Sequence, residues 1–212
     1  NESHAHMIPT MAPCNSAGMA TGLREMKRQV LARKLADTAF SLTKTQGFDQ
    51  TTIDQIVAEA MVSRRTFSNY FDCKEHAVAQ KLVHSASDGL RGWDTPSQDL
   101  GVVQRVRNLT QHQAVSGTLE VLVELAALAN EHGQLAPYLR EAQWQVWALA
   151  GESVIDTFGP MADARVVREV TAVVGAVFAI MTKAVIDAAE PEPLEVLGDL
   201  TETFDALAQA FD

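Results

Sequence analysis

The sequence predicts an all-α protein of about nine helices, and two observations support this fold class. Apolar residues recur at spacings of three and four almost throughout the chain after residue 22, which is the period of an amphipathic helix. No segment alternates apolar and polar residues as a half-buried strand does, and even the valine-rich stretch 166–177 keeps helical spacing. These patterns indicate helices packed on helices.

The composition is that of a globular protein. The chain has 212 residues, of which 47% are hydrophobic and 21% are charged. No apolar run is long enough to span a bilayer, so we expect no membrane partner. Cys14 and Cys73 are the only cysteines, too few for a disulfide scaffold or a four-cysteine zinc site. We therefore expect a cytoplasmic protein without a metal site or a cofactor.

Residues 1–21 differ from the rest because they show neither a helical nor a strand period and include Pro9 and Pro13. We interpret them as a tag remnant or a disordered arm. The folded chain is expected to begin at residue 22.

Three helices are predicted in the first third of the chain. The first ends at Gly47. The second is short and opens with Thr52 and Gln55, whose spacing is that of a capping box. A turn at 61–63 leads to the third helix, over 64–71, with Ser63 as its N-cap. Residues 72–75 form a second capping-box pattern and start a longer helix to about residue 90.

The segment 92–96 contains glycine and proline and breaks the helical pattern. We place a boundary there, between an N-terminal head with its following helix at 22–90 and a C-terminal body at 91–212. Beyond it, the pattern predicts one helix through about residue 115 and others at 118–131, 135–158, 164–189 and 194–211.

The net charge of −10 is distributed unevenly. Residues 22–84 contain ten basic and seven acidic side chains, whereas residues 85–212 contain seven and nineteen. A basic head on an acidic body is typical of a protein that binds a polyanion with one end. Chance clustering on a solvated surface is the alternative.

Two short capped helices joined by a tight turn, at about 52–71, fit a helix-turn-helix motif. In this motif the second helix presents its N-terminal residues to the major groove. Arginine donates two hydrogen bonds to guanine, and asparagine pairs with adenine. The second helix has both residue types on a polar face, beside Phe67 and Phe71 as core anchors. That polar face comprises Arg64, Arg65, Thr66, Ser68, Asn69 and Tyr70.

Many positions in this region match the DNA-binding signature of the tetracycline-repressor (TetR) family in register. They are Gly47-Phe48, Thr51-Thr52-Ile53, Ile56-Val57, Ala60-Met61-Val62-Ser63, Arg65-Thr66-Phe67, Asn69-Tyr70-Phe71 and Lys74-Glu75. The chain thus resembles that family over roughly residues 24–90.

The resemblance implies a three-helix head, a fourth helix that links it to the body, a homodimer, and a ligand pocket in each body. Residues 22–90 would then be a DNA-binding domain with its linking helix, and residues 91–212 a ligand-binding and dimerisation domain. It also implies that Thr52, Tyr70 and Lys74 contact phosphates, while Arg64, Arg65, Thr66 and Asn69 reach bases.

The chain departs from the family pattern at two positions. Met61 stands in the turn where glycine is usual, and a non-glycine residue at positive φ costs roughly 1 kcal/mol. Ser68 stands in the recognition helix where an aromatic residue is usual. A known base preference therefore does not transfer directly to this chain.

Near the C-terminus, Leu197, Leu200, Phe204 and Leu207 recur at spacings of three and four. This narrow apolar seam is suited to packing between helices. The resemblance implies that the last two helices of each subunit form a four-helix bundle with those of the partner. Packing within one chain is the alternative interpretation of the same spacing.

A ligand pocket is expected around Arg140, Trp144 and Trp147, because large aromatic side chains beside a few polar groups are typical of ligand cavities. An ordinary core and its rim have the same composition. The layout of the body is similar to that of TetR regulators whose effectors are acyl-CoA thioesters, so we expect an acyl-CoA or another amphipathic effector.

The sequence thus predicts a bacterial DNA-binding transcriptional regulator, specifically a repressor that a small-molecule effector releases from a palindromic double-stranded operator. A helical ligand-binding or adaptor protein that does not bind an operator is the alternative. We do not expect an enzyme, because the sequence contains no glycine-rich phosphate loop and no nucleophile elbow, and its histidines lack metal-ligand spacing.

Overall fold

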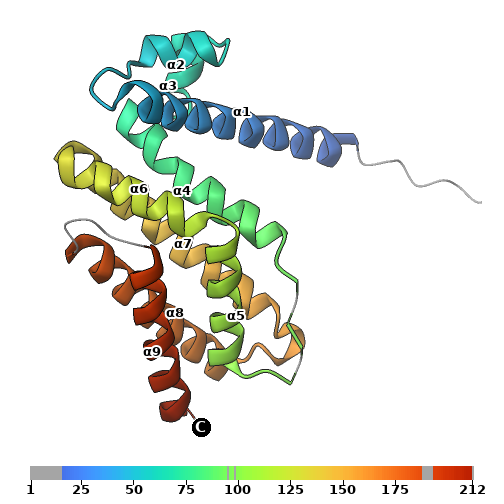
Figure 1. Cartoon of the computed structure of the whole chain (residues 1–212). Coiled ribbons are helices and arrows are strands. Elements are labelled where there is room, and N and C mark those ends of the chain that lie inside the picture. Colours follow the sequence, from blue (N-terminus) through green and yellow to red (C-terminus); the bar gives the residue numbers. More distant parts are fainter. Residues whose placement is uncertain (1–15, 95, 98, 188–192, 212) are drawn as a thin grey trace, which may run out of the picture.

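The computed structural model describes residues 16–94, 96–97, 99–187 and 193–211. Within these ranges the chain forms nine α-helices and two short 3-10 turns, with no strand, which confirms the predicted all-α fold (Figure 1). The helices are α1 (Ser16–Gln46), α2 (Ile53–Glu59), α3 (Arg64–Ser68), α4 (Lys74–Arg91), α5 (Val102–Val115), α6 (Thr118–Glu131), α7 (Ala136–Asp156), α8 (Ala164–Asp187) and α9 (Pro193–Phe211).

Helices α1, α2 and α3 form a head at one end of the molecule (Figure 1). Their shared core consists of fully buried apolar side chains from all three helices, including Leu35 of α1, Ile56 of α2 and Phe67 of α3. Burying such a side chain contributes about 1.5–3 kcal/mol. These contacts hold two helices that are too short to be stable on their own.

Helix α4 connects the head to the body, packing against α1 on one side and against α6 and α7 on the other. Helix α8 packs on α5, α7 and α9, at the end of the body away from the head (Figure 1). A single cluster of buried apolar residues runs from the head through α4 into the body. A displacement of α4 would therefore alter the side-chain packing of both the head and the body.

Two helix boundaries in the head differ from the sequence prediction. Helix α1 begins at Ser16, inside the range 1–21 that was expected to lie outside the fold; residues 1–15 lie outside the described residues. No proline interrupts 16–22, and its alanine and methionine residues favour a helix. Helix α3 ends at Ser68, so Asn69 is its C-cap rather than an interior residue.

The second capping box, predicted at 72–75, is not formed. Cys73 is the N-cap of α4, and its Sγ accepts a hydrogen bond from the His76 backbone N–H at 3.4 Å. Burial raises the pKa of the Cys73 thiol, which favours its protonated form.

The body also contains a fully buried arginine on α5. The Arg105 guanidinium donates to the carbonyl oxygens of Leu100 and Thr157, each at 2.8 Å, and lies 3.9 Å from the centre of the Phe158 ring. A buried charge is tolerated when its donors are satisfied in this way. Arg105 thereby ties the segment before α5 to the end of α7.

Among the described helices, none combines the length and the apolar character needed to cross a membrane.

Candidate functional site

The start of α2 is fixed by Thr52 and Gln55. The Thr52 hydroxyl accepts from the Gln55 backbone N–H at 3.3 Å, and the Gln55 side chain accepts from the Thr52 backbone N–H at 2.9 Å. This reciprocal pair confirms the predicted capping box. Thr52 is exposed at the N-terminus of α2, where backbone N–H groups and the helix dipole favour an anion.

Helix α3 begins where the sequence predicts. Ser63 is its N-cap and accepts from the Thr66 backbone N–H at 3.0 Å. Phe67 is fully buried, which anchors one side of the helix in the core. The opposite side therefore faces outward, where Arg64, Arg65, Ser68 and Asn69 are exposed and Thr66 and Tyr70 are half-buried.

The two arginines at the start of α3 differ in their partners. Arg64 donates to Asp54 of α2 at 2.7 Å, whereas the side chain of Arg65 has no ion pair or hydrogen bond within the described part of the chain. The Arg64–Asp54 pair is largely exposed, and such pairs are weak. Arg65 is therefore free to contact another molecule, whereas Arg64 would first have to leave Asp54.

Lys74, at the first position of α4, lies against the loop between α1 and α2. Its ammonium donates to the carbonyl oxygens of Phe48 at 2.7 Å and Thr51 at 3.0 Å, and it lies 4.4 Å from the centre of the Phe48 ring. Lysine has three donors, and these two carbonyls use two of them. Lys74 therefore holds the loop that precedes Thr52, a role that the sequence did not reveal.

The turn between α2 and α3 contains Met61 at φ 56°, the only described non-glycine residue in the left-handed region. The side chain is 83% exposed. The sequence predicted a strained residue here, and the backbone confirms it. No contact of Met61 with the core offsets the strain.

The described arrangement is a helix-turn-helix: a capped α2, a left-handed turn, and a capped α3 with one buried and one polar face. Residues 35–79 match the family model described as "Bacterial regulatory proteins, tetR family". Residues 35–79 therefore carry the DNA-binding domain of the TetR family. The match extends from the middle of α1 into the first turns of α4, so it coincides with the head. No curated protein matches the chain.

This match supports a DNA-binding transcriptional regulator with a helix-turn-helix head. This confirms the resemblance drawn from the motif residues.

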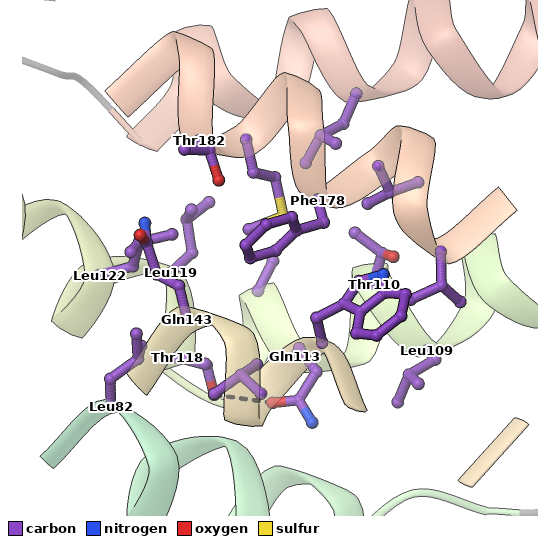
Figure 2. A pocket seen from close by; sticks show the side chains of 17 residues that line it. Leu82, Leu109, Thr110, Gln113, Thr118, Leu119, Leu122, Gln143, Phe178 and Thr182 are labelled. Carbon is purple, nitrogen blue, oxygen red and sulfur yellow. Dashed lines mark hydrogen bonds between the residues drawn. The ribbon is translucent and has the colours of Figure 1, made fainter. Parts of the chain in front are cut away.

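The body contains a cavity of about 110 Å³. Its walls come from α4, α5, α6, α7, α8 and α9, and they include Leu82, Leu122, Trp147, Phe178 and Leu200 (Figure 2). None of the lining residues is Asp, Glu, Lys, Arg or His. The cavity is therefore an apolar site without charge.

A few polar groups interrupt this apolar lining. The Trp147 indole N–H and the Thr182 hydroxyl are buried and have no hydrogen-bond partner among the described residues. Gln143 is also buried, and its side-chain amide makes no hydrogen bond within that part of the chain. Figure 2 shows the Gln143 amide and the Thr182 hydroxyl pointing into the lined space.

The residues expected to bind a ligand are distributed unevenly around this cavity. Trp147 lines it. Trp144 is 57% exposed and stacks on the outer side of Trp147, with ring centres 4.5 Å apart. Arg140 is exposed on α7 and does not line the cavity. The sequence analysis did not place Gln143 at the site, although it lies four residues before Trp147 and therefore on the same helix face.

Gln113 of α5 joins the cavity to α4. It lines the cavity, its amide nitrogen donates to the Ala86 carbonyl of α4 at 3.0 Å, and its amide oxygen accepts from the Thr118 hydroxyl at 2.7 Å. Figure 2 shows the bond to Thr118. Gln113 thus connects the cavity wall to the linking helix by a hydrogen bond.

The apolar side of α9 faces the interior of the single chain. Leu200 is 3% exposed and Phe204 is 2% exposed in the single chain, and Leu207 is half-buried. The side chain of Leu197 lies outside the described residues. Because α9 packs on α5 and α8, Leu200 and Phe204 belong to the intrachain core, the alternative that their spacing left open.

Proposed function

We propose that this regulator is a cytoplasmic repressor that binds a palindromic operator as a homodimer and is released by a small molecule held in the body. The observation that supports DNA reading most directly is the exposed polar face of α3, backed by the buried Phe67. An anchored helix with outward Arg and Asn side chains has the residue types that read base edges.

We assign base contacts to Arg64, Arg65, Thr66 and Asn69, with Ser68 on the same face. Arg65 and Asn69 are exposed and carry the strongest potential for bidentate pairing. Thr52, Tyr70 and Lys74 would contact phosphates. For Lys74, this uses the donor that the Phe48 and Thr51 carbonyls leave over.

The proposed dimer uses the outward faces of α8 and α9, because Leu200 and Phe204 are already buried in the protomer. Exposed small residues, among them Ala172 and Ala179, lie on the side of α8 opposite Val173 and Val177 of the core. Small side chains let a partner helix approach closely. Exposed Arg168 on α8 and Glu202 on α9 also supply opposite charges for a symmetric pair.

The proposed switch acts through α4. Leu82 of α4 lines the cavity, and Gln113 bonds to Ala86 one turn further along. A ligand shifts a conformational equilibrium only by its differential affinity for the two states. The DNA-bound spacing of the heads must therefore disfavour the ligand-bound position of α4. By linkage, operator and effector weaken each other by the same factor, about 5–150-fold in typical cases.

Selection of bound duplexes from a random library tests the operator proposal. Wild-type protein should enrich a partly palindromic sequence, and its affinity should fall steeply with salt. Arg65→Ala or Asn69→Ala should lose about 1–3 kcal/mol of discrimination at one position in each half-site. Arg140→Ala, on the exposed side of α7, is the matched control and should leave the enriched sequence unchanged.

A library that yields no enriched sequence would contradict the operator proposal. If the same protein still binds small molecules, the result would favour the alternative of a ligand-binding or adaptor protein.

A further inference from the structure

The cavity between α4 and α9 constrains the chemistry of its occupant more narrowly than the proposed function requires. We infer that the effector is a small, uncharged, mainly apolar molecule with one polar group that accepts a hydrogen bond from the Trp147 indole N–H and pairs with Gln143 or Thr182. The inference rests on the proposed role of the cavity as the effector site.

The absence of charge in the lining excludes an ionic ligand group. All charged side chains of the described residues lie outside the cavity wall. An ion moved into such a site would lose its hydration without gaining a counter-charge, which is far more costly than burying a neutral group. A coenzyme A thioester carries several phosphates, which need cations for recognition. The acyl-CoA effector suggested by the layout of the body therefore does not fit this cavity.

The unpaired polar groups define where the polar part of the ligand lies. Buried N–H and O–H groups without partners are rare in proteins, because each has lost its hydration without gaining a hydrogen bond. Here the Trp147 N–H and the Thr182 hydroxyl are both unpaired within the described chain, and both residues line the cavity. A ligand hydroxyl, carbonyl or ether oxygen would accept from Trp147, and a hydroxyl would also donate to Gln143.

The Trp147 ring is held in place by its neighbours. Trp144 stacks on it, and Phe178 lies beside it with ring centres 6.5 Å apart. A β-carbon on Gly175 would lie 3.8 Å from the indole nitrogen, so α8 passes close to the N–H group. The donor is thus presented in one orientation, which favours selection by hydrogen bonding.

The size of the cavity limits the ligand to about one ring. Its volume of about 110 Å³ is somewhat smaller than an apolar cavity of roughly 150 Å³ that accommodates benzene. A short-chain alcohol, ketone or ester has the appropriate dimensions, and a six-membered ring with a short polar substituent fits once a flexible lining side chain such as Met181 shifts. Anything larger would require movement of the helices.

Calorimetric titration of the full-length protein with four probes of one size tests the inference. The probes are benzyl alcohol, toluene, benzoate and benzylammonium. We expect benzyl alcohol to bind about tenfold more tightly than toluene, as one net hydrogen bond would give. We expect neither ion to bind at concentrations that saturate the alcohol.

Trp147→Phe removes the indole N–H and keeps an aromatic ring, so it should abolish the preference for benzyl alcohol over toluene. Trp144→Phe makes the same chemical change on the exposed neighbour and should leave that preference intact. Thr182→Val removes the second unpaired group at nearly constant shape and should reduce the preference in part.

Benzoate or benzylammonium binding as tightly as the alcohol would overturn the inference, as would an unchanged preference in Trp147→Phe or no binding by any probe. Release of a labelled operator is measured separately by anisotropy. Selective binding of the alcohol without operator release would support the ligand class and contradict the proposed repressor switch.

Discussion

The side-chain amide of Gln113 occupies the space that a β-carbon on Gly89 would need. The amide oxygen lies 2.5 Å and the amide carbon 2.9 Å from that position. Both distances are shorter than any normal contact, so α5 approaches α4 this closely only because residue 89 is glycine. The approach gives Gln113 its bond to Ala86.

Gly89→Ala should therefore displace the Gln113 amide and destabilise the protein by about 1–3 kcal/mol, the usual cost of overpacking. In a Gln113→Ala background the same substitution should stabilise it by about 0.5–1 kcal/mol, because alanine is favoured over glycine within a helix. Urea unfolding of the four proteins in a double-mutant cycle measures the sign change. Equal effects in both backgrounds would show that the two residues are independent.

Lys74→Met should affect both stability and DNA binding. The bonds to the Phe48 and Thr51 carbonyls involve a charged donor, whose loss typically costs about 1.5–3 kcal/mol. If the third donor contacts a phosphate, the slope of log K against log salt should fall by about one. Arg140→Met removes a charge from the body and should change neither quantity. A destabilised variant with an unchanged slope would leave Lys74 as a loop-holding residue alone.

Met61→Gly should stabilise the head by about 1 kcal/mol, because it removes the cost of a side chain at φ 56°. The greater freedom of glycine in the unfolded chain offsets part of the gain. Met61→Ala keeps a β-carbon in the left-handed region and should bring no gain. Thermal unfolding of the three proteins measures the difference, and a stabilised alanine variant would show that the backbone strain is not the cause.

We expect the free energy of unfolding to change with pH because of His84. Burial, followed by the positive charge of Arg33, lowers the pKa of this imidazole from 6.5 to about 4. Lys81 and Arg91 act in the same direction, while Asp37 opposes them. Between about pH 4 and pH 6.5, His84 is therefore protonated in the unfolded chain but largely neutral in the folded chain. The stability that comes from a neutral His84 is complete above pH 6.5 and is lost as the pH falls toward about 4.

His84→Gln is uncharged at every pH and should lose less stability than the wild type between about pH 7.5 and pH 5. Urea unfolding at the two pH values measures the difference, and other titrating groups cancel because both proteins share them. Parallel losses in the two proteins would contradict the lowered pKa.

Ala179→Arg should dissociate the proposed dimer. The exposed side of α8 carries small residues, and a long charged side chain at its centre would keep a partner helix away and bury an unpaired charge. Ala127→Arg makes the same change on the exposed side of α6 and should preserve the dimer. Sedimentation at micromolar concentration distinguishes the two species, and a wild-type monomer would contradict the dimer itself.

The sequence alone determined most of the secondary structure of this regulator. Helical periodicity located the later helices to within a few residues, and α6 occupies the predicted range of 118–131. Thr52, Ser63 and Met61 were correctly placed as two caps and a strained turn. These features depend on spacings of a few residues, which a single chain displays directly.

The tertiary structure decided which surfaces face each other. Gln113, Gln143 and Thr182 come from three helices and meet at one cavity only after packing, so no local pattern connects them. The spacing of Leu200 and Phe204 was compatible with an intrachain core or a dimer seam, and the burial of both side chains within one protomer favours the core. Periodicity determines which side of a helix is apolar, but the identity of the surface that covers it depends on contacts between residues far apart in the chain.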